Sequence, residues 1–171
     1  MTEITLRPTA DGYISEMWYG YANVSDDSDS TFIYKTNSTG WVRSAFSTLM
    51  SIPHNVTISK VEVKYRWRRA VSYNNPVNCK AFIRLGGTNY DAPQRTTSSA
   101  SFVDQTETWA QNPATLTTWD RSDLNSMEFG VYGSPNHTKG GIYISEIYLI
   151  VTFFESAPFE SAPMGGGAIM F

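Results

Sequence analysis

Three aromatic residues in a short stretch near the N-terminus are the residues best suited to contact a ligand. Trp18, Tyr19 and Tyr21 lie close together, with Asn23 nearby. Amphipathic rings offer a flat apolar face beside polar groups, which suits the stacking of a sugar ring. Aromatic residues are also enriched in the cores of protein interfaces. The stretch therefore predicts a subunit contact or a glycan platform, with the subunit contact favoured, or else burial beneath a long loop.

A cluster of acidic residues follows this stretch. Asp26, Asp27 and Asp29 could supply carboxylate oxygens, which are the ligands that calcium prefers. The stretch lacks the glycine at the sixth place and the glutamate at the twelfth place that complete the usual calcium loop. A solvated turn that caps the strand beginning at Thr31 is therefore favoured over a calcium site.

The sequence contains no recognisable set of catalytic residues. His54 and His137 stand in separate turn-like contexts, without the spaced histidine or neighbouring cysteine of a zinc site. Nucleophile-elbow, P-loop and dinucleotide-binding motifs are absent. Cys79 is the single cysteine and lies in an alternating run, which indicates a small buried side chain. We therefore expect a protein that is not an enzyme and has no cofactor.

The composition excludes further classes of partner. The chain of 171 residues has 13 basic and 16 acidic residues, and its cations form no extended basic patch. This pattern argues against nucleic acid as a partner. No run of 18 apolar residues is present, and the first residues do not resemble a secretion signal. We expect neither a membrane partner nor secretion.

The hydrophobic pattern is typical of β-strands almost throughout. Long alternating runs cover 57–71, 77–83 and 141–154, and shorter candidates cover 4–6, 31–34, 41–46, 101–109 and 127–132. Only 119–126 favours a short helix, with Thr118 or Ser122 as its N-cap. Turn-forming residues separate the runs at the spacing of a sandwich. Residues 1–154 are therefore predicted to form an all-β, two-layer antiparallel sandwich of jelly-roll or related Greek-key topology.

The last residues of the sequence differ from the rest. The pentad Phe-Glu-Ser-Ala-Pro occurs at 154–158 and again at 159–163, and three glycines and an apolar end follow. The prolines favour an extended chain, and the glycines favour a swivel. We expect residues 155–171 to form an extended arm that docks on a neighbouring subunit, because a free apolar end is unfavourable in water. The expected contact residues are Phe159, Met164, Ala168, Ile169, Met170 and Phe171.

Several segments, in this order, resemble a family of β-sandwich domains found in structural proteins of tailed phages and related viruses. They are LRPTADGY at 6–13, DDSDSTFIY at 26–34, TISKVEVKYRWR at 57–68, RLGGTNY at 84–90, TWAQNPATLTTWDRSDLNSMEFGV at 108–131 and YISEIYLIVTF at 143–153. The resemblance covers about residues 4–154.

The resemblance implies a non-enzymatic virion structural protein, namely a head-decoration or capsid-associated subunit. Its expected partners are copies of itself, in a homo-oligomer such as a trimer, and other virion proteins. Its expected location is the virion, after assembly in the host cytoplasm. A carbohydrate-binding module and a receptor-binding tail-fibre tip are the alternatives, and a glycan is then the partner.

Overall fold

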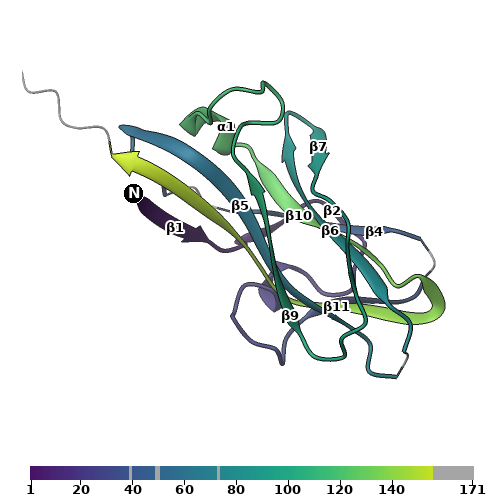
Figure 1. The fold of residues 1–171 in the computed structure, drawn as a ribbon. Helices are drawn as coiled ribbons and strands as arrows, with labels where there is room; N and C mark the ends of the chain where they lie inside the picture. Colours follow the sequence, from purple (N-terminus) through teal and green to yellow (C-terminus); the bar gives the residue numbers. More distant parts are fainter. Residues whose placement is uncertain (39, 49–50, 73, 156–171) are drawn as a thin grey trace, which may run out of the picture.

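Two antiparallel β-sheets packed face to face make up the structure (Figure 1). The computed structural model describes residues 1–38, 40–48, 51–72 and 74–155. In sheet A the strand order is β1 (Thr2–Leu6), β11 (His137–Glu155), β5 (Val56–Arg69) and β9 (Val103–Trp109), and β3 (Ile33–Ser38) also pairs with β11. In sheet B the order is β2 (Ala10–Ser15), β4 (Val42–Ser47), β10 (Glu128–Ser134), β6 (Val77–Leu85) and β7 (Thr88–Asp91), and β8 (Arg95–Thr97) pairs with β6. The predicted two-layer antiparallel sandwich is confirmed.

Strand β11 has 19 residues and organises sheet A. One of its edges pairs with β5, from Ile142 opposite Arg69 to Glu155 opposite Val56. Its other edge pairs first with β3 and later with β1, so that the first strand of the chain lies beside the last one (Figure 1). Between β3 and β1, the Val24 carbonyl accepts a hydrogen bond from the Ile147 amide at 3.0 Å. Both edges of β11 are therefore covered, so its backbone groups are paired on both sides.

The core lies between the sheets and follows the predicted alternation. In β5, every second side chain from Val61 to Trp67 is almost fully buried, and the intervening charged residues face outward. Cys79 of β6 is fully buried, as predicted. Burial raises the pKa of the Cys79 thiol, so this thiol is structural rather than reactive.

A short helix closes one end of the core. The helix α1 (Arg121–Leu124) lies within the predicted helical segment, but its N-cap is Asp120 rather than Thr118 or Ser122. The Asp120 carboxylate accepts a hydrogen bond from the Ser122 amide at 2.9 Å, and the Asp120 amide donates to the Asp123 carboxylate at 2.8 Å. Asp120 and Asp123 also form a capping box, in which each side chain binds the backbone of the other residue, and the sequence did not predict it.

Three short strands and a 3₁₀ turn were not predicted. These elements are β2, β7, β8 and the turn η1 (Tyr21–Asn23). None of the residues of β2 is fully buried. The strand therefore needs no alternation of apolar and polar residues, and the sequence pattern does not mark it. Among the described residues, no helix is long and apolar enough to cross a membrane. The expected arm lies almost entirely outside the described residues, and the division at residue 154 stays a prediction.

Candidate functional site

The outer face of sheet B carries a group of three aromatic rings. Tyr13 of β2 and Trp41, directly before β4, are each 41% exposed, and Tyr132 of β10 is half-buried. The ring centres of Trp41 and Tyr132 are 6.5 Å apart, and the ring planes meet at 82°. We use the name sheet B face for these rings and the polar side chains around them, namely Tyr13, Trp41, Arg43, Lys80, Arg84, Asn89 and Tyr132.

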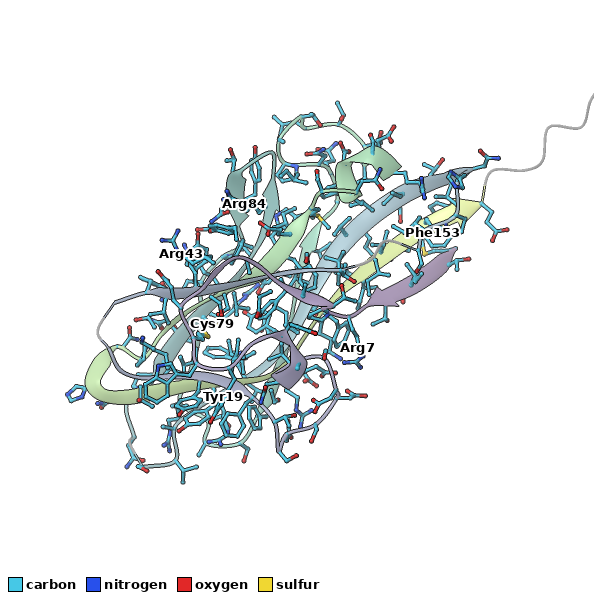
Figure 2. The ribbon with its side chains drawn as sticks, turned by 180° about the vertical axis from the view of Figure 1, so that it is seen from behind. Arg7, Tyr19, Arg43, Cys79, Arg84 and Phe153 are labelled. Carbon is cyan, nitrogen blue, oxygen red and sulfur yellow. The ribbon has the colours of Figure 1, made fainter. Side chains whose placement is uncertain are left out.

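Cationic side chains flank the rings of the sheet B face. Arg43 and Lys80 lie opposite Tyr132 on the two neighbouring strands. Their charged groups lie 5.6 and 4.7 Å from the centre of the Tyr132 ring. The Arg84 guanidinium lies 3.7 Å from the centre of the Tyr13 ring, and Figure 2 shows Arg43 and Arg84 on the same side of the molecule. These cation–π contacts hold the rings and the cations in fixed mutual positions.

An amide side chain joins the two tyrosines. Asn89 of β7 donates through Nδ2 to the hydroxyls of Tyr13 and Tyr132, at 2.8 and 2.6 Å. The Asn89 Oδ1 accepts a hydrogen bond from Arg84 at 3.0 Å. One short polar residue therefore links β2, β10 and β6 across the face, although these strands lie far apart in the sequence.

Each cation of the face also has a carboxylate partner. Arg43 lies 3.8 Å from Glu16, Arg84 lies 3.3 Å from Glu128, and Lys80 is paired with Asp91. The face is consequently polar without an excess of one charge. It offers hydrogen-bond donors and acceptors in fixed positions, which is what recognition of a neutral polar ligand requires.

The backbone of β2 brings Tyr13 to this face. The pairing of β2 with β4 is interrupted between Asp11 and Ser15, and the Tyr13 amide donates to Glu128 at 2.8 Å. A Cβ atom at Gly12 would lie 2.7 Å from a carboxylate oxygen of Glu128 and 2.9 Å from the backbone of Ala45. Only glycine allows the chain to pass so close to β4 and β10 at this point.

The predicted aromatic residues lie on a different surface, at the outer side of sheet A. Trp18, Tyr19 and Tyr21 are 56%, 61% and 37% exposed. The Trp18 ring centre is 5.0 Å from that of Tyr34 in β3. Burial beneath a loop, which was one of the three interpretations, is therefore wrong. The exposure is consistent with either a glycan platform or a subunit contact.

The three predicted calcium ligands point to different partners. Asp26 accepts hydrogen bonds from the Ser28 amide at 3.3 Å and the Thr31 hydroxyl at 2.7 Å, as the turn interpretation expects. Asp29 accepts hydrogen bonds from Arg66, and Asp27 lies 3.4 Å from an arginine, Arg7. Within residues 1–38, 40–48, 51–72 and 74–155, no group of three His, Cys, Asp or Glu side chains could hold a metal ion. The structure gives the calcium hypothesis no support.

Three acidic side chains in this region have shifted pKa values, and the pKa of Asp27 is lowered by its hydrogen bond with Glu146 and by the charge of Arg7. Burial raises the pKa of Glu146, and the neighbouring Asp27 raises it further. For Asp29, burial acts to raise the pKa, but the hydrogen bonds from Arg66 and Ser145 outweigh it and the pKa is lowered. The region therefore contains two carboxyl groups that are held ionised, Asp27 and Asp29, and one whose ionisation is opposed, Glu146.

The expected contact residues of the C-terminal arm are not among the described residues. They are Phe159, Met164, Ala168, Ile169, Met170 and Phe171. Their role in binding a partner stays a prediction.

Comparison with known proteins adds information on the fold. No protein-family model matches the sequence, and the search of curated proteins finds no match. The xylan-binding domain CBM22-1 of Xyn10C from Paenibacillus barcinonensis is similar at a TM-score of 0.52 and 10% identity, over 90% of this chain and 95% of that chain. A cyclase from Fischerella sp. TAU is similar at a TM-score of 0.50 and 13% identity, over 90% of this chain and 86% of that chain. Family 16 carbohydrate-binding module-2 gives a TM-score of 0.42 and 7% identity, over 72% of this chain and 78% of that chain.

These structures overturn the prediction of a virion structural protein. The xylan-binding domain and the cyclase named above share the fold, and neither points to a phage or a capsid. Partners among virion proteins and copies of this chain are likewise unsupported. The resemblance to phage domains holds only for the two-layer β-sandwich. Alternating strands and turn residues recur in many sandwiches of unrelated function, so these segments identified the fold and not the role.

Proposed function

We propose that this chain is a non-catalytic carbohydrate-binding domain that binds a neutral oligosaccharide on the sheet B face. The proposal depends on one observation, the placement of the rings of Tyr13, Trp41 and Tyr132 beside amide and guanidinium groups. A sugar ring has an apolar CH face and polar hydroxyls. Aromatic rings take the CH face, and fixed polar side chains take the hydroxyls.

The exposed ring of Trp41 is the main stacking surface in this proposal. It is 41% exposed, and its position is restrained by Lys80, which lies 5.3 Å from its ring centre, and by Tyr132. Asn89 and Arg84 border the same face and supply hydrogen-bonding groups for hydroxyls. Because the network already holds these side chains, little conformational entropy is lost when a ligand binds.

The pairing of charges favours a neutral ligand and binding without catalysis. Every cation of the sheet B face is ion-paired, so an anionic sugar would have to displace Glu16, Asp91 or Glu128. The same pairing leaves none of these three carboxylates free to act as the general acid of a glycosidase. The xylan-binding domain of similar fold supports this ligand class, at the level of fold.

Binding to a panel of polysaccharides tests the proposal. Affinity electrophoresis in gels that contain xylan, β-glucan or mannan should show retarded migration in at least one gel, and calorimetry with the matching hexasaccharide gives the Kd. Trp41→Ala is expected to weaken binding about tenfold, which corresponds to about 1.4 kcal/mol. Val71→Ala is the control, because Val71 is 68% exposed and has no place in the site.

Two results would contradict the proposal. One is that no polysaccharide of the panel binds the wild-type chain. The other is that Trp41→Ala and Val71→Ala bind as tightly as the wild type, which would remove the sheet B face from the site.

A further inference from the structure

The outer side of sheet A carries a second aromatic surface, built on a row of side chains that crosses the strands. Trp18 forms a β-bridge with Tyr34, Tyr34 pairs with Tyr143 of β11, and Tyr143 pairs with Arg68 of β5. The rings of Tyr34 and Tyr143 are stacked at 5.4 Å and 9°. The Arg68 guanidinium lies 4.5 Å from the centre of the Tyr143 ring and 4.7 Å from that of Phe102. Inside the row, the rings and the guanidinium cover one another.

The end of the row at Trp18 differs from its interior, because the rings of Trp18 and the neighbouring Tyr19 are open to solvent. Trp18 meets Tyr34 at an interplanar angle of 76°, and Tyr19 meets Tyr34 at 49° with a centre distance of 5.7 Å. Neither ring is stacked face to face on Tyr34, and each is more than half exposed. Trp18 and Tyr19 therefore keep ring surface free for a ligand.

The backbone holds Tyr19 in an unusual conformation. Its φ is 66°, in the left-handed region that bulky residues adopt only at a cost. The flanking chain is fixed by two backbone hydrogen bonds between Trp18 and Tyr34, at 2.9 and 3.3 Å, and by the Tyr21 amide, which donates to Asp11 at 2.8 Å. A strained and well-anchored backbone that projects an exposed ring indicates a position selected for contact.

A polar pocket of about 180 Å³ lies next to the row. Its lining residues are Asp27, Ser28, Asp29, Arg66, Ser145 and Glu146. Arg66 and Arg68 are two residues apart on β5, so the pocket begins about 7 Å from the stacked row. Asp29 accepts two hydrogen bonds from Arg66 at 2.8 Å and one from Ser145 at 2.8 Å.

A guanidinium also binds the other two carboxylates of the pocket. Arg7 lies 3.3 Å from Glu146 and 3.4 Å from Asp27. Each carboxylate of the pocket therefore faces a cation, as on the sheet B face, and a neutral polar ligand is again favoured.

We propose that Trp18, Tyr19 and the polar pocket beside the aromatic row form a second carbohydrate-binding site, on the side of the sandwich opposite the sheet B face. Trp18 and Tyr19 stack on sugar rings, while Ser28, Asp29 and Arg66 hydrogen-bond to hydroxyls. The ligand class rests on the proposed function, and the location rests on this geometry alone. Figure 2 shows Tyr19 separated from Arg43 and Arg84 by the region around the core residue Cys79.

A sugar fits this surface better than a second copy of the chain does. Trp18 and Tyr19 border the partly buried ring of Tyr34, which in turn contacts Phe32, and a charged pocket flanks the row. Stable protein interfaces bury about 800 Å² on each partner, with an apolar centre. Two partly exposed rings beside a charged pocket suit one or two sugar units instead.

Calorimetric titration with a hexasaccharide tests the second site. The probes are xylohexaose, cellohexaose and mannohexaose, and the ligand that binds most tightly is used for all variants. The wild type is expected to bind two ligands per chain. The double variant Trp18→Ala/Tyr19→Ala and the single variant Trp41→Ala are each expected to lose one of the two sites, with affinity at that site reduced at least tenfold. The variant Trp18→Phe/Tyr19→Phe keeps rings at both positions and should retain two sites, and circular dichroism checks that every variant is folded.

The outcomes separate this inference from the proposed function. The second site is overturned if Trp18→Ala/Tyr19→Ala binds like the wild type or if Trp41→Ala abolishes all binding. If Trp18→Ala/Tyr19→Ala abolishes all binding and Trp41→Ala has no effect, the sheet A site stands and the sheet B site is wrong. Absence of binding by the wild type overturns both. Light scattering adds a last check, because a wild-type oligomer that the double variant converts to a monomer would make the surface a subunit contact and would overturn the inference.

Discussion

Tyr65 shows how a single buried hydroxyl affects this core. The side chain is fully buried in β5, and its ring packs against Trp67 at 6.2 Å. Among the described residues, the hydroxyl makes no hydrogen bond of normal geometry, and the Cys79 thiol, a weak hydrogen-bonding group, lies near it. Burial raises the pKa of Tyr65, so the group stays protonated without a strong partner. A buried polar group without a partner costs about 1–3 kcal/mol.

Tyr65→Phe is therefore expected to stabilise the protein by about 1 kcal/mol, because it keeps the ring and removes the unpaired hydroxyl. Urea unfolding followed by fluorescence measures the free energy of unfolding. Tyr148→Phe is the control, since Tyr148 is a partly exposed tyrosine with Arg7 and Lys64 near its ring. A loss of stability in Tyr65→Phe that exceeds the loss in the control would contradict the expectation.

At the same scale, the sequence identified side chains but not their groupings. Alternation predicted the burial of Tyr65 and Cys79 because it depends on neighbouring positions only. The rings of Tyr13, Trp41 and Tyr132 come from three distant segments, and the register between strands brings them together. No spacing in the sequence encodes that register, so the sheet B face could not be predicted. Trp18 and Tyr19 were found because they are adjacent in the chain.

At the scale of elements, the long strands were predictable and the short ones were not. Strands β5 and β11 have many alternating positions, whereas β2 buries no residue fully and β8 has three residues. The cap of α1 was misplaced because several capping residues lie next to one another at 118–123. Element boundaries depend on tertiary contacts that a local pattern does not contain.

Strand β10 has one position where only glycine fits. A Cβ atom at Gly130 would lie 2.1 Å from the Ser44 carbonyl oxygen and 2.7 Å from the Phe82 ring. Phe82 is fully buried, although it lies outside the core between the sheets, and its ring centre is 4.8 Å from that of Tyr132. Gly130 thus allows Phe82 to pack beneath the sheet B face.

Gly130→Ala is expected to destabilise the protein by about 1–3 kcal/mol, as overpacking usually does, because neither the β4 backbone nor the Phe82 ring can move freely. It should also weaken carbohydrate binding on the sheet B face by displacing Tyr132. Gly40→Ala is the matched control, since a Cβ atom there would contact nothing within 4 Å. Thermal unfolding and calorimetry measure both effects, and equal behaviour of the two variants would show that β10 tolerates the added methyl group.

At the scale of the whole molecule, the sandwich is closed by contacts between the two ends of the described chain. β1 pairs with the last part of β11, from Thr2 opposite Phe153 to Leu6 opposite Leu149 (Figure 1). Leu6 is 5% exposed and belongs to the core. Without β1, the edge of β11 would present unpaired backbone groups beside an apolar surface, which is a template for pairing with another chain.

Deletion of residues 1–6 is therefore expected to lower stability and to cause concentration-dependent self-association. Leu6→Ala separates the two causes, because it removes the core side chain and keeps the strand. This variant should lose about 2–3 kcal/mol and remain as monomeric as the wild type. Urea unfolding and light scattering over a range of concentrations give the two readouts. A deletion variant that loses no more stability than Leu6→Ala and does not self-associate would show that β1 contributes only Leu6, and that the edge of β11 needs no cover.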